Sequence, residues 1–184
     1  MATDYGTLRD NLRCFYDFVD KVVLYVGAGG RQLLDPSIKT RKLVAINQDA
    51  LALQELKANV EGESISKVEL LASRFESITV SGDVVYFEFC LHEMADPEKA
   101  LHKARTLAPD TVVFDHLPDS DWVFHAAEEN EVLRSAAAIE RFGVRRRKQF
   151  STDQRFRDHA ELLAKGQCAR GSGNRARAEV CRHN

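Results

Sequence analysis

The sequence predicts a single α/β domain built on a doubly wound, mostly parallel sheet with helices on both faces. Five short apolar segments alternate with segments of helical periodicity, which is the pattern of repeated βαβ units. The first apolar segment, 22–26, leads directly into the glycine-rich turn Gly27-Ala28-Gly29-Gly30. Glycine permits a tight turn and a close approach of the backbone to a ligand. A chain of 184 residues is long enough to bury one such core.

The strands are expected at residues 22–26, 42–46, 68–72, 83–89 and 111–115, with two weaker candidates at 143–150 and 177–182. Apolar and β-branched residues dominate the first five, as expected of strands that are covered on both faces. In such a sheet, ligands bind outside the carboxyl ends of the parallel strands. The residues that directly follow each strand are therefore the first candidates for a functional site.

Helices are expected between and after these strands. The first, 8–19, has an apolar stripe that ends at Val19, and Asp49 caps a helix through residue 60 with Leu51 among its apolar positions. Asp96-Pro97-Glu98 combines a cap residue, a proline and an acid, which together favour a helix start. The other expected helices span 30–34, 128–140 and 151–165, the last of them capped by Ser151.

Composition narrows the class of protein. The chain shows no apolar run of about 20 residues and no N-terminal secretion signal, so we expect no membrane association and a cytoplasmic location. Its four cysteines have no CxxC spacing, which favours free thiols in a reducing compartment. The whole chain, 1–184, is expected to form one domain, with an N-terminal helical segment in 1–20 and a poorly defined basic tail at 166–184. Because the rest of the chain is acidic, a nucleic acid is disfavoured as the main ligand.

Three motifs at the strand ends resemble the class I S-adenosylmethionine-dependent methyltransferases, particularly their small single-domain members. They are 24–30 (LYVGAGG), 45–49 (AINQD) and 83–101, in which Leu91-His92-Glu93 followed by Asp96-Pro97 and Leu101 is the most specific piece. The resemblance covers roughly residues 22–121. It implies the class I methyltransferase fold, S-adenosylmethionine as cofactor, and antiparallel strands that close the sheet at its C-terminal end.

The resemblance also implies a set of cofactor-binding residues. They are Tyr25, Gly27, Ala28, Gly29, Asn47, Gln48, Ser73, Arg74, Phe75 and Phe89. The family usually has an acid where this chain has Tyr25, Asn47 and Ser73. Replacing three charged hydrogen bonds by neutral ones would weaken binding by about 10²-fold in total. A nicotinamide site is disfavoured, because Gln32 and Asn47 stand where a glycine and an acid would be needed.

The acceptor substrate is expected to contact His92, Glu93, His116 and Trp122. His92 is the candidate catalytic residue, because a neutral histidine can take a proton from an oxygen, nitrogen or thiol acceptor. The alternative is that His92 packs beneath the following helix and bonds a backbone carbonyl. Trp122 belongs to a long segment after the fifth strand that is either a lid over the site or a surface loop anchored by its aromatic residues.

Other clusters carry weaker signals. His116, His125, Glu128 and Glu129 lack a metal-binding spacing signature, so we expect no metal. Cys90 is expected to be a small buried residue rather than a reactive thiol. The basic run 145–148 is typical of a charged edge strand, with a phosphate or RNA contact as the alternative.

Together these features predict a methyltransferase that acts on a small-molecule acceptor. The alternative hypothesis is a non-catalytic relative that keeps the fold and a degenerate cofactor pocket and serves as a binding or partner subunit. An unpaired sheet edge at the C-terminal end would allow a homodimer.

Overall fold

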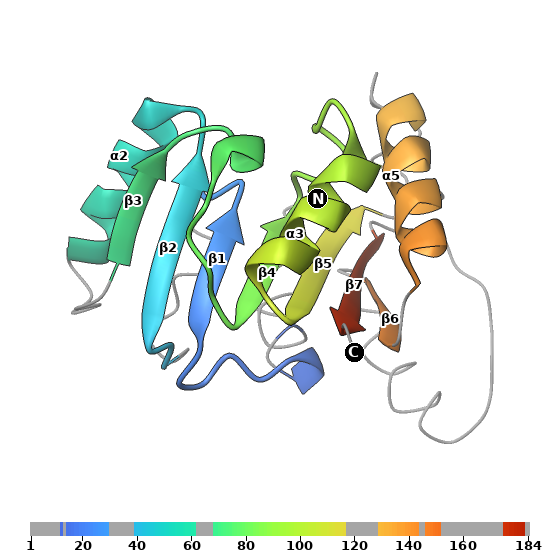
Figure 1. Cartoon of the computed structure of the whole chain (residues 1–184), viewed down its shortest axis with the longest axis horizontal. Helices are drawn as coiled ribbons and strands as arrows, with labels where there is room; N and C mark the ends of the chain where they lie inside the picture. Colours follow the sequence, from blue (N-terminus) through green and yellow to red (C-terminus); the bar gives the residue numbers. More distant parts are fainter. Residues whose placement is uncertain are drawn as a thin grey trace.

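The computed structural model describes residues 12, 14–29, 39–61, 68–116, 129–143, 146–151 and 175–182. In this part of the chain the central element is a seven-stranded sheet with the order β3-β2-β1-β4-β5-β7-β6 (Figure 1). The strands are β1 (Val22–Val26), β2 (Lys42–Asn47), β3 (Val68–Ala72), β4 (Val84–Glu88), β5 (Asp110–His116), β6 (Arg146–Ser151) and β7 (Arg175–Arg182). The helices are α2 (Ala50–Glu61), α3 (Pro97–Leu107) and α5 (Glu129–Phe142), with a short 3₁₀ turn η1 (Phe75–Ser77) after β3.

The first five strands form a parallel sheet whose order reverses between β1 and β4. Both neighbours of β1 are therefore parallel to it, with Val26 opposite Ile46 on β2 and Phe87 on β4. The reversal leaves a crevice at the carboxyl ends of these strands, where doubly wound folds bind ligands. The predicted α/β fold class is confirmed for these strands and their helices.

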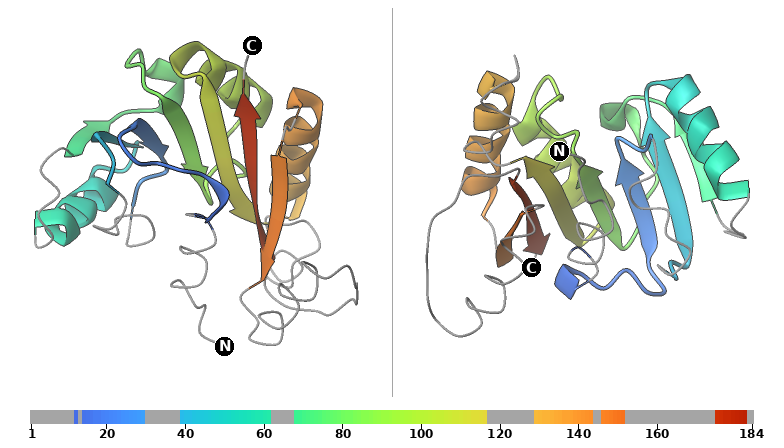
Figure 2. Two further views of the ribbon diagram at one scale, coloured as in Figure 1. Left: turned by 90° about the horizontal axis from the view of Figure 1, so that it is seen from below. Right: turned by 180° about the vertical axis from the view of Figure 1, so that it is seen from behind.

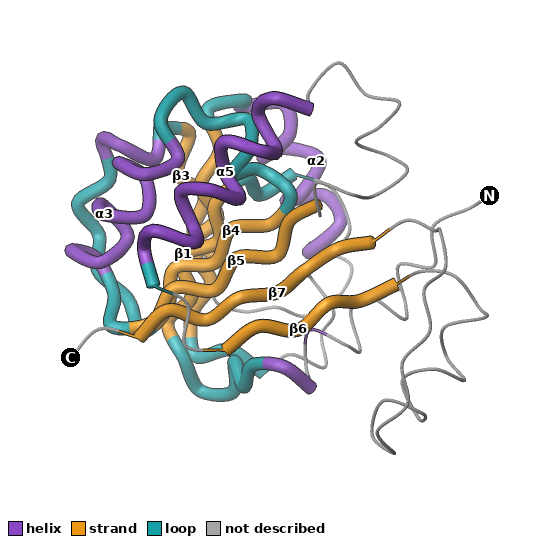
Figure 3. The backbone as a smooth tube through the Cα atoms, turned by 90° about the vertical axis from the view of Figure 1, so that its right-hand side faces the viewer, coloured by secondary structure: helices purple, strands orange, loops and turns teal. Residues whose placement is uncertain are grey.

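Strand β7 lies between β5 and β6 and runs antiparallel to both of them. It comes from the basic segment 166–184, and its backbone pairs with β5 along Ala176–Arg182 and with β6 along Arg175–Val180. Strand β6 follows α5 and forms one edge of the sheet (Figures 1 and 3). The predicted basic edge strand is thus present, since Arg146, Arg147 and Lys148 belong to β6.

Helices cover the two faces of the sheet separately, as Figures 2 and 3 show. On one face, Leu53 and Leu56 of α2 pack with Val23 and Tyr25 of β1. On the other face, α3 and α5 pack against the alternate residues of the same strand, including Leu24. The strands are buried on both sides, which explains why their sequences are almost continuously apolar.

Local signals set the helix starts. The Asp96 carboxylate accepts a hydrogen bond from the backbone N–H of Lys99 at 3.0 Å, and Pro97 occupies the first helical turn of α3. Asp49 caps α2 in the predicted way, because its side chain accepts from the backbone N–H of Leu51 at 2.8 Å. Each cap accepts a hydrogen bond from a backbone N–H group that has no partner within the first turn of the helix.

Two expectations about the elements are wrong. The first helix does not reach Val19, which lies in a turn and is 50% exposed. Leu51 is 69% exposed, whereas Leu53 and Leu56 of α2 face the sheet. Ser151 is the last residue of β6, and the helix that it is expected to cap lies outside the described residues. The helices expected in 30–34 and 152–165 lie outside the described residues.

Among the helices that the structure describes, none is both long enough and apolar enough to cross a membrane.

Candidate functional site

A cavity of about 380 Å³ lies at the carboxyl ends of β1, β2 and β4. Its walls include most residues that the sequence predicts for a cofactor site, namely Tyr25, Gly27, Gly29, Asn47, Gln48, Ser73, Arg74, Phe75 and Phe89, together with Glu93. The remaining wall residues include Glu76, Glu88, Cys90, Met94 and Ala95. A volume of this size is typical of a small-molecule site.

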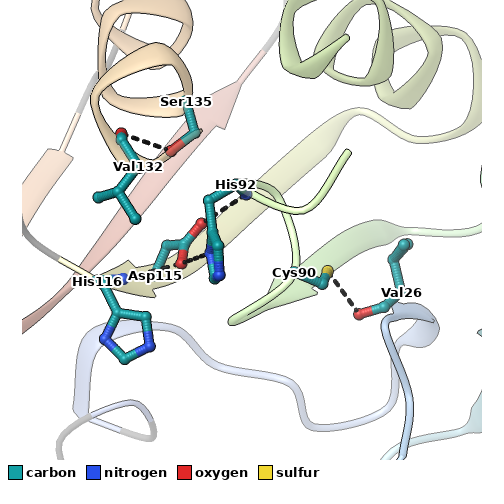
Figure 4. Close-up of polar contacts among 7 residues, drawn as sticks. All are labelled: Val26, Cys90, His92, Asp115, His116, Val132 and Ser135. Carbon is teal, nitrogen blue, oxygen red and sulfur yellow. Dashed lines mark hydrogen bonds and ion pairs between the residues drawn. The ribbon is translucent and has the colours of Figure 1, made fainter. Parts of the chain in front are cut away.

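The glycine turn after β1 is shaped by its contact with Cys90. Gly27 has φ +76°, and a Cβ atom built on it would lie 2.5 Å from Cys90 Cβ and 2.7 Å from Cys90 Sγ. The Cys90 thiol donates to the carbonyl of Val26 at 3.3 Å (Figure 4). Burial raises the pKa of Cys90 well above its ordinary value, so the group stays a neutral thiol. Cys90 is therefore the buried residue that the sequence predicts.

Asn47 joins the turn after β1 to the turn after β2. Its Nδ2 donates to the carbonyl of Ala28 at 3.0 Å, and its Oδ1 accepts from the backbone N–H of Asp49 at 2.9 Å. Ala28 itself is fully buried. The Asn47 amide therefore builds the wall of the cavity, and its Oδ1 keeps one further lone pair for a ligand.

Glu88 brings a buried carboxyl group into the cavity. It is the last residue of β4 and is only 7% exposed. The hydroxyl of Tyr25, on the neighbouring strand β1, donates to Glu88 Oε2. Burial and the nearby Glu88 raise the pKa of Tyr25 well above its ordinary value, so Tyr25 remains a donor. The Tyr86 hydroxyl makes no hydrogen bond of good geometry within the described part, although it lies near enough to stabilise the Glu88 carboxylate.

Burial raises the pKa of Glu88 to about 7, and the hydroxyls of Tyr25 and Tyr86 only partly oppose this shift. The folded chain therefore holds a proton between the ordinary pKa of 4.5 and about 7 that the unfolded chain has released. Folding stability must fall as the pH rises through this window.

Replacing Glu88 with glutamine is expected to remove this loss of stability. In the absence of ligand, the variant should match the wild type near pH 5 and exceed it at pH 8 by up to about 3 kcal/mol in free energy of unfolding. Urea titrations at four pH values measure this difference. A gap between the two proteins that stays constant from pH 5 to 8 would show that Glu88 does not titrate in this window.

His92 and Asp115 form a second buried cluster, at the ends of β4 and β5 (Figure 4). His92 Nδ1 lies 2.7 Å from Asp115 Oδ1, and the backbone N–H of His92 donates to Oδ2 at 3.2 Å. His92 is 3% exposed and Asp115 is fully buried. Because a carboxylate only accepts, Nδ1 carries the proton, and the contact orients the imidazole ring.

The placement of His92 differs from the alternative expectation that its side chain bonds a backbone carbonyl, while its catalytic role stays a prediction. The side chain points to a carboxylate rather than to a backbone carbonyl, and its neighbours Cys90 and Glu93, rather than His92 itself, line the cavity. The pairing with Asp115 is a long-range contact that no local pattern around His92 indicates.

His116 connects this cluster to the cavity wall. Its ring lies 5.6 Å from that of His92 and 4.7 Å from that of Phe89, which lines the cavity. Phe89 adopts φ +46°, a conformation that is strained for an aromatic residue and is found more often at functional sites than elsewhere. Burial lowers the pKa of His116 to about 4, so its imidazole is neutral at neutral pH.

Trp122, His125 and Glu128 lie outside the described residues. Within the part of the chain that is described, no group of three or more His, Cys, Asp or Glu side chains could hold a metal ion.

Solved structures supply the comparison for this architecture. A SAM-dependent methyltransferase from Aquifex aeolicus matches with a TM-score of 0.56 and 17% identity, over 97% of this chain and 88% of that protein. An S-adenosylmethionine-dependent methyltransferase from Mesorhizobium loti matches with a TM-score of 0.59 and 11% identity, over 99% and 98% of the two chains. The chain has the class I methyltransferase fold.

The methyltransferase fold does not by itself identify a reaction. A precorrin-8w decarboxylase from Methanobacterium thermoautotrophicum matches equally well, with a TM-score of 0.63 and 12% identity over 95% of this chain and 88% of that protein. No protein-family model matches the sequence, and no curated protein is significantly similar to it. At such low identity the comparisons establish the fold alone.

Sequence reasoning missed Glu88, although a signal for it exists. A glutamate within the apolar run VVYFEF, at the carboxyl end of a buried parallel strand, is unusual, because buried carboxylates need a partner. In this methyltransferase fold, that position lies beside the glycine turn. The backbone oxygen of Glu88 would lie 3.4 Å from a Cβ atom at Gly27.

Proposed function

We propose that the chain binds S-adenosylmethionine in this cavity and directs its methyl group to a small-molecule acceptor. The observation that carries the proposal is the buried carboxyl of Glu88, which lines the same cavity as the glycine turn. The cofactor is a cation, so a wall that holds an acid offers it a favourable field. When bound, it supplies a methyl group activated by a sulfonium leaving group.

The residues of the cavity fit such a ligand. Gly27 and Gly29 form the turn beside it, where a Cβ at either position would approach Cys90 or Ala52 to 3.0 Å or less. Asn47 and Gln48 at the end of β2 would face a ribose, and Ser73, Arg74 and Phe75 would border an adenine. Ala28 would contribute through the carbonyl that Asn47 holds in place. Phe89 forms part of the wall beside Glu88.

The acceptor is proposed to enter beside Glu93 and Phe89, near His116, and a contact with Trp122 stays a prediction from the sequence. Of the charged residues in the cavity wall, three are acids and one, Arg74, is basic. This charge disfavours a nucleic acid and favours a neutral or cationic small molecule. Positioning the acceptor in line behind the methyl group would supply much of the acceleration. His92, oriented by Asp115, is the proposed base for the acceptor's proton.

A second function is favoured by the environment of Asn47. Both functional atoms of its side chain are already bonded to backbone groups, so its amide contributes to the turns whether or not a ligand binds. A non-catalytic relative with a weak cofactor site would retain this arrangement. The two functions differ in affinity for the cofactor and in methyl transfer.

Calorimetric titration with S-adenosylmethionine and S-adenosylhomocysteine, with NAD as the control ligand, tests the proposal. We expect dissociation constants between about 1 and 100 μM for the first two and none measurable for NAD, because the cavity offers an acid to the cationic half of the ligand. Absence of binding at millimolar concentration would reject the methyltransferase and leave the non-catalytic relative. Binding without methyl transfer to any of a panel of amine, phenol, carboxylate and thiol acceptors would favour the same alternative.

A further inference from the structure

Glu88 is the one buried acid among the described residues of the cavity wall. Glu76 and Glu93 also line the cavity, but both are exposed to solvent, and Glu76 is paired with Arg74 at 3.8 Å. Glu88 is 7% exposed, and no described residue supplies a positive charge to it. Its hydrogen-bond donor is the neutral hydroxyl of Tyr25.

A buried carboxylate without a cation is costly, because it loses its hydration without gaining a counter-charge. The cost is avoided in two ways. Either Glu88 keeps a proton, or a ligand brings a cation to it. Tyr25 holds Glu88 at the cavity wall, so the carboxyl faces a site that a ligand can reach.

We propose that Glu88 is a specificity-determining residue that binds the primary ammonium group of the ligand's amino-acid half. This inference rests on the proposed function and names the group by which the ligand is recognised. Of the two cationic groups of S-adenosylmethionine, only the ammonium has N–H donors. A charge-assisted hydrogen bond from an N–H donor offsets the cost of desolvating a buried carboxylate. A sulfonium has no N–H donor and offsets this cost less well.

Three ligands separate the groups that could contact Glu88. S-adenosylmethionine carries the ammonium and the sulfonium, S-adenosylhomocysteine carries only the ammonium, and 5′-methylthioadenosine carries neither. By calorimetry, Glu88→Gln is expected to bind S-adenosylmethionine and S-adenosylhomocysteine with 10- to 100-fold lower affinity than the wild type. Affinity for 5′-methylthioadenosine should change by less than about twofold, because the glutamine keeps the size and the Tyr25 contact.

Glu55→Gln is the control, since it removes an exposed acid of α2 that is not part of the cavity wall. It is expected to change the affinity for all three ligands by less than about threefold, as a screened surface charge does. An equal loss for all three ligands in Glu88→Gln would overturn the proposal in favour of a structural role. A loss confined to S-adenosylmethionine would overturn it in favour of a sulfonium contact.

The unmodified protein provides a second test. Other titratable groups that face Glu88 are Tyr25 on β1, Tyr86 on β4 and Cys90 after β4, and the pKa of each is raised, so they stay neutral below pH 8. Arg74, Glu76 and Glu93 are the other charged groups of the wall. Because Glu88 ionises near pH 7, affinity for S-adenosylhomocysteine should rise about tenfold from pH 6 to 8, and that for 5′-methylthioadenosine should not.

Equal pH profiles for the two ligands would overturn the inference while leaving the proposed function intact. If the wild type binds none of the three ligands, both fail together.

Discussion

Replacing Asp115 with alanine is expected to lower the free energy of unfolding by about 3–5 kcal/mol. The fully buried carboxylate accepts three hydrogen bonds, two from His92 and one from the backbone N–H of His116 at 2.9 Å. Alanine would leave these donors buried without a partner. Urea unfolding followed by circular dichroism measures the change, and thermal unfolding should show a decrease of roughly 10 °C for a chain of this size.

Asp17→Ala is the control for this prediction, because Asp17 is exposed and accepts one hydrogen bond, from the backbone N–H of Val19 at 3.0 Å. Its loss should cost about 1 kcal/mol or less. Asp115→Asn keeps one acceptor oxygen and should fall between the two. If Asp115→Ala proves no more harmful than Asp17→Ala, the buried cluster does not stabilise the fold.

Gly27→Ala should destabilise the fold by about 2–4 kcal/mol and abolish ligand binding. Two effects add at this position. The backbone has φ +76°, which an L side chain rarely adopts, and the new Cβ would overlap Cβ and Sγ of Cys90. Relief of the overlap requires movement of Gly27 or of Cys90. Both residues line the cavity, so either movement changes its shape. Chemical unfolding and calorimetry with S-adenosylhomocysteine measure the two consequences.

Gly143→Ala separates the two effects. Gly143 has φ +86°, but a Cβ there would meet no atom within 4 Å. Alanine at this position should therefore cost only the backbone strain, about 1 kcal/mol. The difference between the two variants measures the overlap with Cys90. If Gly27→Ala and Gly143→Ala destabilise the fold equally, the turn after β1 moves away from Cys90 without a loss of stability.

Much of the candidate site could be predicted from the sequence, because its backbone is built from local signals. Apolar runs place β1, β2 and β4, and the glycines mark where a strand turns beside a ligand. The topology of a parallel sheet then brings residues that follow different strands to one edge. Tyr25, Asn47, Ser73 and Phe89 reach the same cavity for this reason.

The side-chain partnerships of the site could not be predicted in this way. Glu88 meets Tyr25 because β4 lies next to β1, and a strand pairing over more than sixty residues leaves no local trace. His92 meets Asp115 because β5 follows β4 in the sheet. In both cases the sequence names the residues but contains nothing that specifies the contact.

The last strand shows the same division. Alternation in 177–182 and a basic composition are weak local signals, since a short polar strand gains little from its own residues. Strand β7 exists because β5 and β6 offer it hydrogen-bonding partners on both sides. The sequence by itself determined the fold class, the parallel strands and the edge that forms the cavity, because periodicity and turn residues act over a few neighbours. Only the tertiary structure decided the buried acid of the cavity, the partner of His92 and the position of β7, because these depend on which strands become neighbours.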